Sequence, residues 1–228
     1  MSLAGFARLA GRRIFATHKH RRTVMRFAEK IGMVYFGAVD HTDDDHRIVR
    51  GLTTSPHYRD THYTIGTYDD YDVAFVERSG SIKMPKGKSE QQQWLVMAVD
   101  LKTQTDLPHV FLGKQSHTQA FYLQFLTKFS YMTRIPTGVS EGYDQKFLQF
   151  YTLYGRIVDQ VAVTELFDPG LCKAIVDHFH ELAVEVSDGV VYLYAENSVP
   201  TEAVLQSMLR YGVWLAQTID AKVSRRAV

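Results

Sequence analysis

Apolar positions recur with helical spacing near both ends of the chain. Residues 17–31 contain the clearest stripe, and the following residue, Gly32, is a typical helix stop. Its members follow the i, i+3, i+4, i+7 pattern of one helix face: Val24, Phe27, Ala28 and Ile31. Similar stripes run through residues 3–15 and 200–219. The pattern therefore predicts helices at both termini.

The middle of the chain changes to a strand pattern. Residues 71–78 and 94–101 are rich in β-branched and aromatic side chains, and the polar stretch 79–92 separates them. This arrangement predicts a β-hairpin with a long loop, followed by a third strand at 108–112. Residues 94–101 are apolar at both sets of alternating positions, which is typical of a central strand covered on both sides.

The C-terminal third alternates strand and helix signals. Residues 147–154 predict a strand, and Asp168 followed by Pro169 predicts the start of a helix. Residues 183–194 predict a hairpin, whereas 115–133 suits either a helix or a strand. The fold class is therefore α+β: an antiparallel sheet built from hairpins, with helices at both termini and between strands.

Changes in pattern divide the chain into three segments. A basic, helical segment spans residues 1–32, a β-rich part spans 33–135, and an α+β part spans 136–228. The boundary falls in a stretch rich in Gly and Pro, but this stretch is too short for a flexible linker, so the last two parts can form one domain. Residues 40–62 are polar and predict a loop leading into short strands.

The composition indicates in which cellular compartment the protein is expected. The chain has 228 residues with 13 Phe and 13 Tyr, enough for a sizeable core, and no apolar run approaches the roughly 20 residues of a membrane span. Cys172 is the only cysteine, so no internal disulfide can form. Its apolar neighbours at helical spacing predict a buried, structural thiol. These features favour a cytoplasmic protein, with room for peripheral contact to a membrane.

Charge is strongly segregated. Residues 1–30 hold eight Lys or Arg and one acidic residue, a formal charge of +7, while the remainder holds 18 against 24, or −6. The predicted contacts to an anionic surface are Arg8, Arg12, Arg13, Lys19, Arg21 and Arg22.

Several partners fit this basic segment. It could pack on the acidic remainder of the chain or on a protein partner, lie on an anionic membrane surface, bind nucleic acid, or act as an organellar presequence. The pattern favours the body or a protein partner, then a membrane surface, over nucleic acid.

Two stretches resemble ligand-binding motifs. Residues 40–46 are rich in Asp and His, and the candidate metal ligands are His41, Asp43, Asp45 and His46. Their spacing matches neither an EF-hand nor a His-Glu-x-x-His helix, so a solvated loop is favoured. Lys86 to Ser89 resembles the end of a phosphate-binding loop, but Ile82 stands where the first glycine is required. The sequence predicts no cofactor.

Four stretches together resemble a bacterial group known as a domain of unknown function. They are residues 51–54, 71–78, 107–112 and 147–193, within a similarity of about residues 50–195. The resemblance implies a strand-rich core and an association with membranes, because members often carry transmembrane helices ahead of the core. This chain has the short basic segment in that place. The resemblance brings no catalytic residues.

Two functional hypotheses remain. The first is a non-catalytic binding or scaffold module at a membrane surface or in a complex. The second is an enzyme whose site is assembled from distant residues, with the Asp/His-rich region 40–62 at its mouth. The sequence holds no nucleophile elbow and no dinucleotide-binding glycine motif to support the second.

Overall fold

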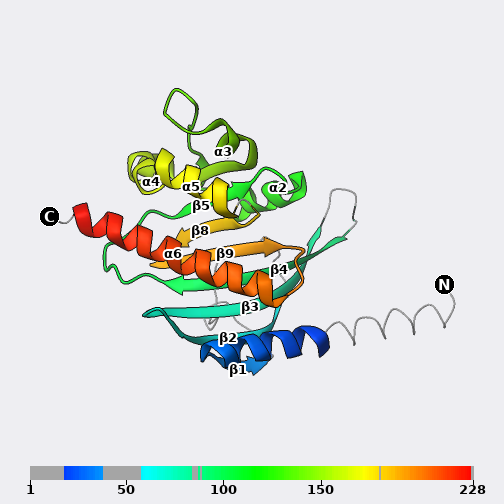
Figure 1. The fold of residues 1–228 in the computed structure, drawn as a ribbon. Coiled ribbons are helices and arrows are strands. Elements are labelled where there is room, and N and C mark those ends of the chain that lie inside the picture. The colour runs from blue at the N-terminus through cyan, green and yellow to red at the C-terminus, as the bar shows by residue number, and fades with distance from the viewer. Residues whose placement is uncertain (1–17, 38–57, 84–86, 88, 180, 227–228) are drawn as a thin grey trace.

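An antiparallel sheet organises the described part of the chain (Figure 1). The computed structural model describes residues 18–37, 58–83, 87, 89–179 and 181–226. The strands are β1 (Val34–Gly37), β2 (Tyr58–Tyr68), β3 (Tyr71–Lys83), β4 (Ser89–Asp100), β5 (Val110–Lys114), β6 (Thr133–Arg134), β7 (Tyr151–Gly155), β8 (Ala183–Ser187) and β9 (Val190–Glu196).

Helices separate the strands and cover them. The helices are α2 (Gln119–Lys128), α3 (Gln145–Phe150), α4 (Gln160–Leu166), α5 (Pro169–Phe179) and α6 (Glu202–Arg226), with a short 3₁₀ helix, η2 (Ile157–Asp159), before α4. A further helix, described over residues 18–31, precedes β1 and is called the N-terminal helix below. The α+β class predicted from the sequence is confirmed.

The order of strands in the sheet is β1-β2-β3-β4-β9-β8-β5-β7-β6. Sequence neighbours pair as hairpins at β2–β3, β3–β4 and β8–β9, but the β8–β9 hairpin inserts between β4 and β5. Strands from the 33–135 and 136–228 parts of the chain therefore alternate within one sheet.

Alternating side chains of the central strands build two core layers. On one face, Phe75, Met97 and Leu193 pack with the N-terminal helix, α5 and α6. On the other face, Val76, Val96 and the ring of Trp94 pack with Phe121 and Phe125 of α2. The predicted central position of residues 94–101 is confirmed, because β4 lies between β3 and β9.

The long helix α6 crosses the sheet over β4 and β9 (Figure 1). It lies close to the sheet at Gly212, where an added Cβ would come within 2.9 Å of Val99 Cγ2. Its Asp220 carboxylate accepts hydrogen bonds from the Tyr71 hydroxyl at 2.9 Å and from the Thr103 amide at 2.9 Å. These contacts join the C-terminal helix to the first half of the chain.

Some local predictions were wrong in extent. Residues 147–154 are not one strand, because Asp144 caps helix α3 by accepting from the Lys146 amide at 2.8 Å and the strand begins only at Tyr151. The loop predicted at 79–92 is mostly strand, since the ladder continues to the Lys83–Ser89 pair. A polar ribbon of this kind needs backbone pairing but no buried side chains, so hydrophobic periodicity cannot reveal it.

Other elements carried weak or ambiguous signals. Residues 58–62, predicted to lie in the polar region, begin the 11-residue strand β2. The ambiguous stretch 115–133 contains helix α2, whose N-cap Thr118 accepts from the Phe121 amide at 3.2 Å. Cys172 is buried on α5 and burial raises the pKa of its thiol, as expected of a structural cysteine.

The position of Trp94 on the central strand β4 predicts that its truncation strongly destabilises the fold. Its indole is buried against Phe121 and Tyr194, with ring centroids 5.7 and 6.1 Å away. Trp94→Ala should therefore lower the free energy of unfolding by about 3–5 kcal/mol. Urea unfolding followed by circular dichroism measures this. Trp214→Ala, at a half-buried indole on α6, is the matched control and should cost less; equal losses would contradict the central role of Trp94.

Candidate functional site

The N-terminal helix is docked on the sheet. Its apolar stripe is used for this contact, because Val24, Phe27 and Ala28 are buried in the same core layer as Phe75. At its C-terminal end, Lys30 Nζ lies 2.5 Å from Glu202 Oε1 at the start of α6. The structure thus places the described part of the basic segment on the body of the protein.

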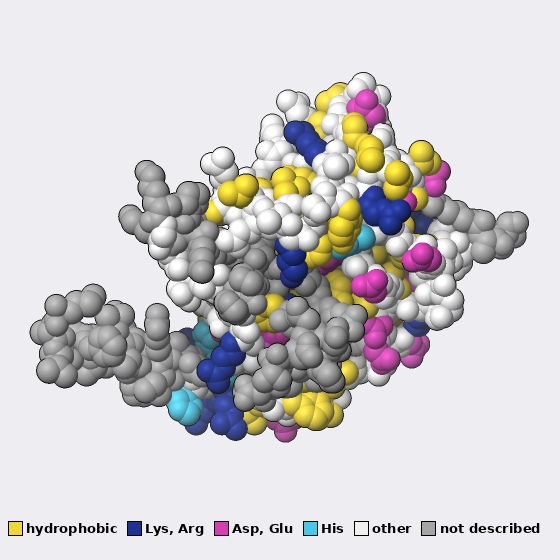
Figure 2. All heavy atoms as spheres, turned by 180° about the vertical axis from the view of Figure 1, so that it is seen from behind, with side chains coloured by type: hydrophobic (Ala, Val, Ile, Leu, Met, Phe, Trp, Pro, Cys, Tyr) yellow, Lys and Arg dark blue, Asp and Glu magenta, His cyan; other side chains and the backbone are white. Residues whose placement is uncertain are grey.

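The outward side of this helix is strongly cationic. Its exposed cationic side chains are Lys19, Arg21, Arg22, Arg26 and Lys30. With residues 199–202 they border a groove of about 1070 Å³, called the basic groove here, in which Glu202 is the only acidic lining residue among the described part of the chain. Two apolar side chains also line it, Met25 and Val199, which are 40% and 51% exposed. Lys, Arg and His side chains gather around the N-terminal helix at the lower left of Figure 2.

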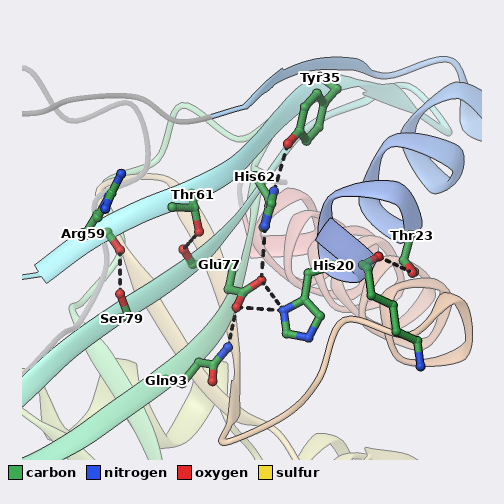
Figure 3. Close-up of polar contacts among 10 residues, drawn as sticks. His20, Thr23, Tyr35, Arg59, Thr61, His62, Glu77, Ser79 and Gln93 are labelled. Atoms are coloured by element: carbon green, nitrogen blue, oxygen red, sulfur yellow. Dashed lines mark hydrogen bonds and ion pairs between the residues drawn. The ribbon is translucent and has the colours of Figure 1, made fainter. Parts of the chain in front are cut away.

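Beneath the helix lies the carboxylate of Glu77, which is buried on β3 (Figure 3). Nδ1 of His20, on the N-terminal helix, lies 3.1 Å from both carboxylate oxygens, and the Gln93 side-chain amide on β4 donates to the carboxylate. His62 Nε2 lies 3.8 Å away on β2. The Glu77 carboxylate is therefore hydrogen-bonded to the helix and to β4, with His62 of β2 nearby at a longer distance.

A β-bulge brings His62 to this position. The register between β2 and β3 shifts between Thr61 and Thr64, and His62 adopts a positive φ of 58°. Its Nδ1 lies 2.8 Å from the Tyr35 hydroxyl. We assign the phenol as donor, which leaves the imidazole proton on Nε2, facing Glu77.

Burial controls the protonation of His62. Desolvation lowers the pKa of this imidazole, and His20 and Arg21 act in the same direction, while Glu77 opposes them. Burial likewise raises the pKa of Tyr35, an effect that Arg21 partly offsets. The cluster therefore holds a neutral imidazole between a phenol and a carboxylate.

The next residue on β3, Arg78, carries a charge to the opposite face of the sheet. Its guanidinium is buried and forms a bidentate ion pair with Asp60 on β2, with two N–O distances of 2.6 Å. The ring of Tyr58 lies over it, with 4.2 Å between the guanidinium carbon and the ring centroid. Two consecutive buried charges on one strand are thus satisfied on different faces by different partners.

The described part of the structure contains only some of the site residues predicted from the sequence. Lys19, Arg21 and Arg22 are exposed and line the basic groove together. Arg8, Arg12 and Arg13, and the candidate metal ligands His41, Asp43, Asp45 and His46, lie outside the described residues. Among the residues that are described, no three His, Cys, Asp or Glu side chains are grouped to hold a metal ion.

Sequence reasoning missed the Glu77 cluster and the outward cations Arg26 and Lys30. A signal for the cluster was present, because Glu77 and Arg78 follow directly on an apolar strand where alternation requires buried residues on both faces. The partners carried no signal, since His20 and Asp60 are distant in sequence. Within the described chain, no helix has the length and apolar character to span a membrane.

Comparisons with known proteins add information about the fold. No family model and no curated protein matches the chain. Among solved structures, it is similar to the crystal structure of the mycobacterial trehalose monomycolate transport factor A, TtfA, with a TM-score of 0.61 and 11% sequence identity over 90% of this chain and 94% of that chain. The two proteins share a fold. At this identity the likeness to TtfA concerns the fold alone.

The buried pair of Asp60 and Arg78 predicts an asymmetric response to mutation. Asp60→Ala removes the carboxylate from a buried guanidinium and should cost about 3–5 kcal/mol of unfolding free energy. Asp60→Leu combined with Arg78→Met should cost much less, because neither charge then remains buried. Urea unfolding tests both. Asp177→Ala, which breaks exposed ion pairs with Lys146 and Lys173, should have little effect; a double variant worse than Asp60→Ala would contradict the argument.

The lowered pKa of His62 predicts that the stability of the protein depends on pH. Because its pKa is lower in the folded state than its ordinary value of 6.5, the unfolded chain binds the proton more readily below that pH. The contribution of His62 to the free energy of unfolding should therefore be fully present above about pH 6.5. It should be lost as the pH falls from there through the lowered pKa. His62→Asn, which tolerates the positive φ, should flatten this fall in urea unfolding measured from neutral to mildly acidic pH. The exposed His178→Asn should not; equal slopes for all three proteins would contradict the prediction.

Proposed function

We propose that this protein is a non-catalytic, peripheral module that binds anionic membrane surfaces through the basic groove of its N-terminal helix. One observation carries the proposal: the apolar stripe of the helix is buried in the core, while its cations face outward together. The helix is therefore a fixed cationic surface. Its described part contacts headgroups mainly by charge, because the apolar stripe is buried in the core and cannot insert into the bilayer.

The composition of the groove favours lipid over nucleic acid. Met25 and Val199 expose apolar surface among the cations. Apolar side chains beside Lys and Arg suit the boundary between headgroups and acyl chains, whereas a phosphate backbone gains nothing from them. The cationic side chains that line the groove are already exposed, so a lipid surface can reach them without any rearrangement of the core.

The fold neighbour supports an accessory role. TtfA is named as a factor for the transport of trehalose monomycolate, and a non-catalytic binding or scaffold module is compatible with a role of that kind. We place this chain on the cytoplasmic side of a membrane in a comparable role, with a protein partner held next to the bilayer. No step of this proposal requires a cofactor or a catalytic residue.

Charge reversal in the groove tests the proposal. Full-length protein should float with phosphatidylcholine vesicles that contain phosphatidylglycerol and should not float with phosphatidylcholine alone. Arg22→Glu with Arg26→Glu should weaken binding at least about thirtyfold, because each cation near an anionic surface contributes about 1 kcal/mol. Added salt should release the wild type, since exposed charges are screened. The melting temperature should hold, because both side chains are exposed.

The control reverses the same number of charges elsewhere. Arg134→Glu with Arg225→Glu alters exposed arginines on β6 and at the end of α6, away from the groove, and should leave flotation intact. Equal loss in both variants would show a net-charge effect without a specific site. Binding to a DNA duplex in place of vesicles would overturn the lipid assignment.

A further inference from the structure

A second concave surface lies where the loop before β5, the end of α2, the η2–α4 segment and the β8–β9 turn meet. It has a volume of about 1110 Å³ and shares no lining residue with the basic groove. We call it the acidic hollow after four of its lining residues: Asp106, Asp159, Glu185 and Asp188. The proposed membrane contact does not involve this hollow.

A chain of hydrogen bonds forms the floor of the hollow. Glu185 is buried, accepts from the Tyr194 hydroxyl, and lies 2.7 Å from His109 Nε2. On the other side of the imidazole, Nδ1 lies 2.9 Å from the Tyr131 hydroxyl. With the proton assigned to Nε2, Tyr131 donates to Nδ1, so the buried carboxylate fixes the orientation of an accessible phenol ring through His109.

Aromatic rings form one wall above this floor. Tyr131 is 49% exposed, and its ring stands at 90° to that of Phe129, with 6.1 Å between centroids. The chain already places one cation against this wall, since Lys128 Nζ lies 5.2 Å from the centroid of Phe129. A fixed, half-exposed tyrosine ring is a surface that binds cations through its π face.

The charge of the hollow is also suited to a cation. Against the four acids stand Lys128 and Arg156, and Arg156 is engaged with Asp159 at 2.9 Å. Asp106 and Asp188 are exposed at the mouth. Burial together with Glu185 and Asp188 raises the pKa of the Tyr131 hydroxyl, while Arg156 opposes the shift, which is consistent with negative potential around the ring.

The lip of the hollow is apolar and unusually exposed. Ile157 and Val158 are 55% and 77% exposed, and Leu107 and Pro108 line the hollow as well. On the face seen in Figure 2, hydrophobic, basic and acidic side chains lie next to one another. Adjacent exposed aliphatic residues beside a charged pocket are typical of protein interaction sites, where a buried anchor is surrounded by apolar contacts.

We propose that the acidic hollow docks a segment of a partner protein that presents an arginine or lysine between apolar side chains. The basic head enters between Tyr131 and Asp188, and the flanking apolar residues cover Ile157 and Val158. An anion is disfavoured by the surplus of carboxylates. A guanidinium gains both the ring contact and charge-assisted hydrogen bonds, so arginine should bind more tightly than lysine.

A matched pair of peptides tests this docking. The probe is an acetylated, amidated Gly-Leu-Arg-Val-Gly peptide, and its partner carries citrulline, which keeps the shape of arginine without the charge. Titration into ¹⁵N-labelled full-length protein should give saturable amide shifts in residues 106, 107 and 109, and in 129–131, 156–162 and 185–192. The citrulline peptide should bind at least about tenfold more weakly.

The chain offers a close control for the acidic contact. Asp188 and Asp70 are both exposed, both have positive φ (52° and 61°), and both occupy two-residue hairpin turns. Asp188→Asn should weaken the arginine peptide about threefold to fivefold and leave the citrulline peptide unchanged, whereas Asp70→Asn should alter neither. Equal melting temperatures of the two variants establish that folding is not the cause.

Three results would overturn the proposal: no saturable binding, equal affinity for the citrulline peptide, or shifts that map outside the hollow. Vesicle flotation should be the same with and without Asp188→Asn. The failure of this proposal is therefore distinguishable from the failure of the membrane proposal.

Discussion

The central strands have to be buried on both faces, and the rest of the molecule depends on this constraint. Strands β3, β4 and β9 are apolar at both sets of alternating positions, so an uncovered face would expose a large hydrophobic surface to water. Helix α6 and the N-terminal helix cover one face and α2 covers part of the other. The apolar stripe of the basic helix is thus a structural requirement, and only its outward side is available to a partner.

Two charges interrupt this apolar centre and are stabilised by geometry. Glu77 and Arg78 are adjacent on β3 and point to opposite core layers, where His20 and Asp60 meet them. Burying either charge alone would be costly, so each position requires its distant partner. The Glu77 cluster also joins the N-terminal helix to the sheet, because His20 of the helix and His62 of β2 both approach the same carboxylate.

Opposite charges are displayed on separate surfaces. The basic groove follows the N-terminal helix, and the acidic hollow lies at the β5–β8 part of the sheet. A module that holds an anionic surface with one and a basic protein segment with the other would keep its partner next to a membrane. The similarity to TtfA concerns the fold on which both surfaces are built.

Local signals in the sequence were enough to determine four features: the α+β class, the central strand at 94–101, the start of α5 and the β8–β9 hairpin. At the start of α5, Asp168 accepts a hydrogen bond from the Leu171 amide at 2.8 Å, as its predicted N-cap role requires. Each of these features depends on periodicity or on residues close together in the chain. Charge counting also located the basic segment. Tertiary structure alone decided that the β8–β9 hairpin inserts between β4 and β5. It also decided that a bulge turns His62 toward Glu77. The meeting of His109, Tyr131 and Glu185 in one hollow is a third feature of this kind. These contacts join residues far apart in sequence, and pairing over such distances is set by the packing of the whole sheet, which no local pattern records.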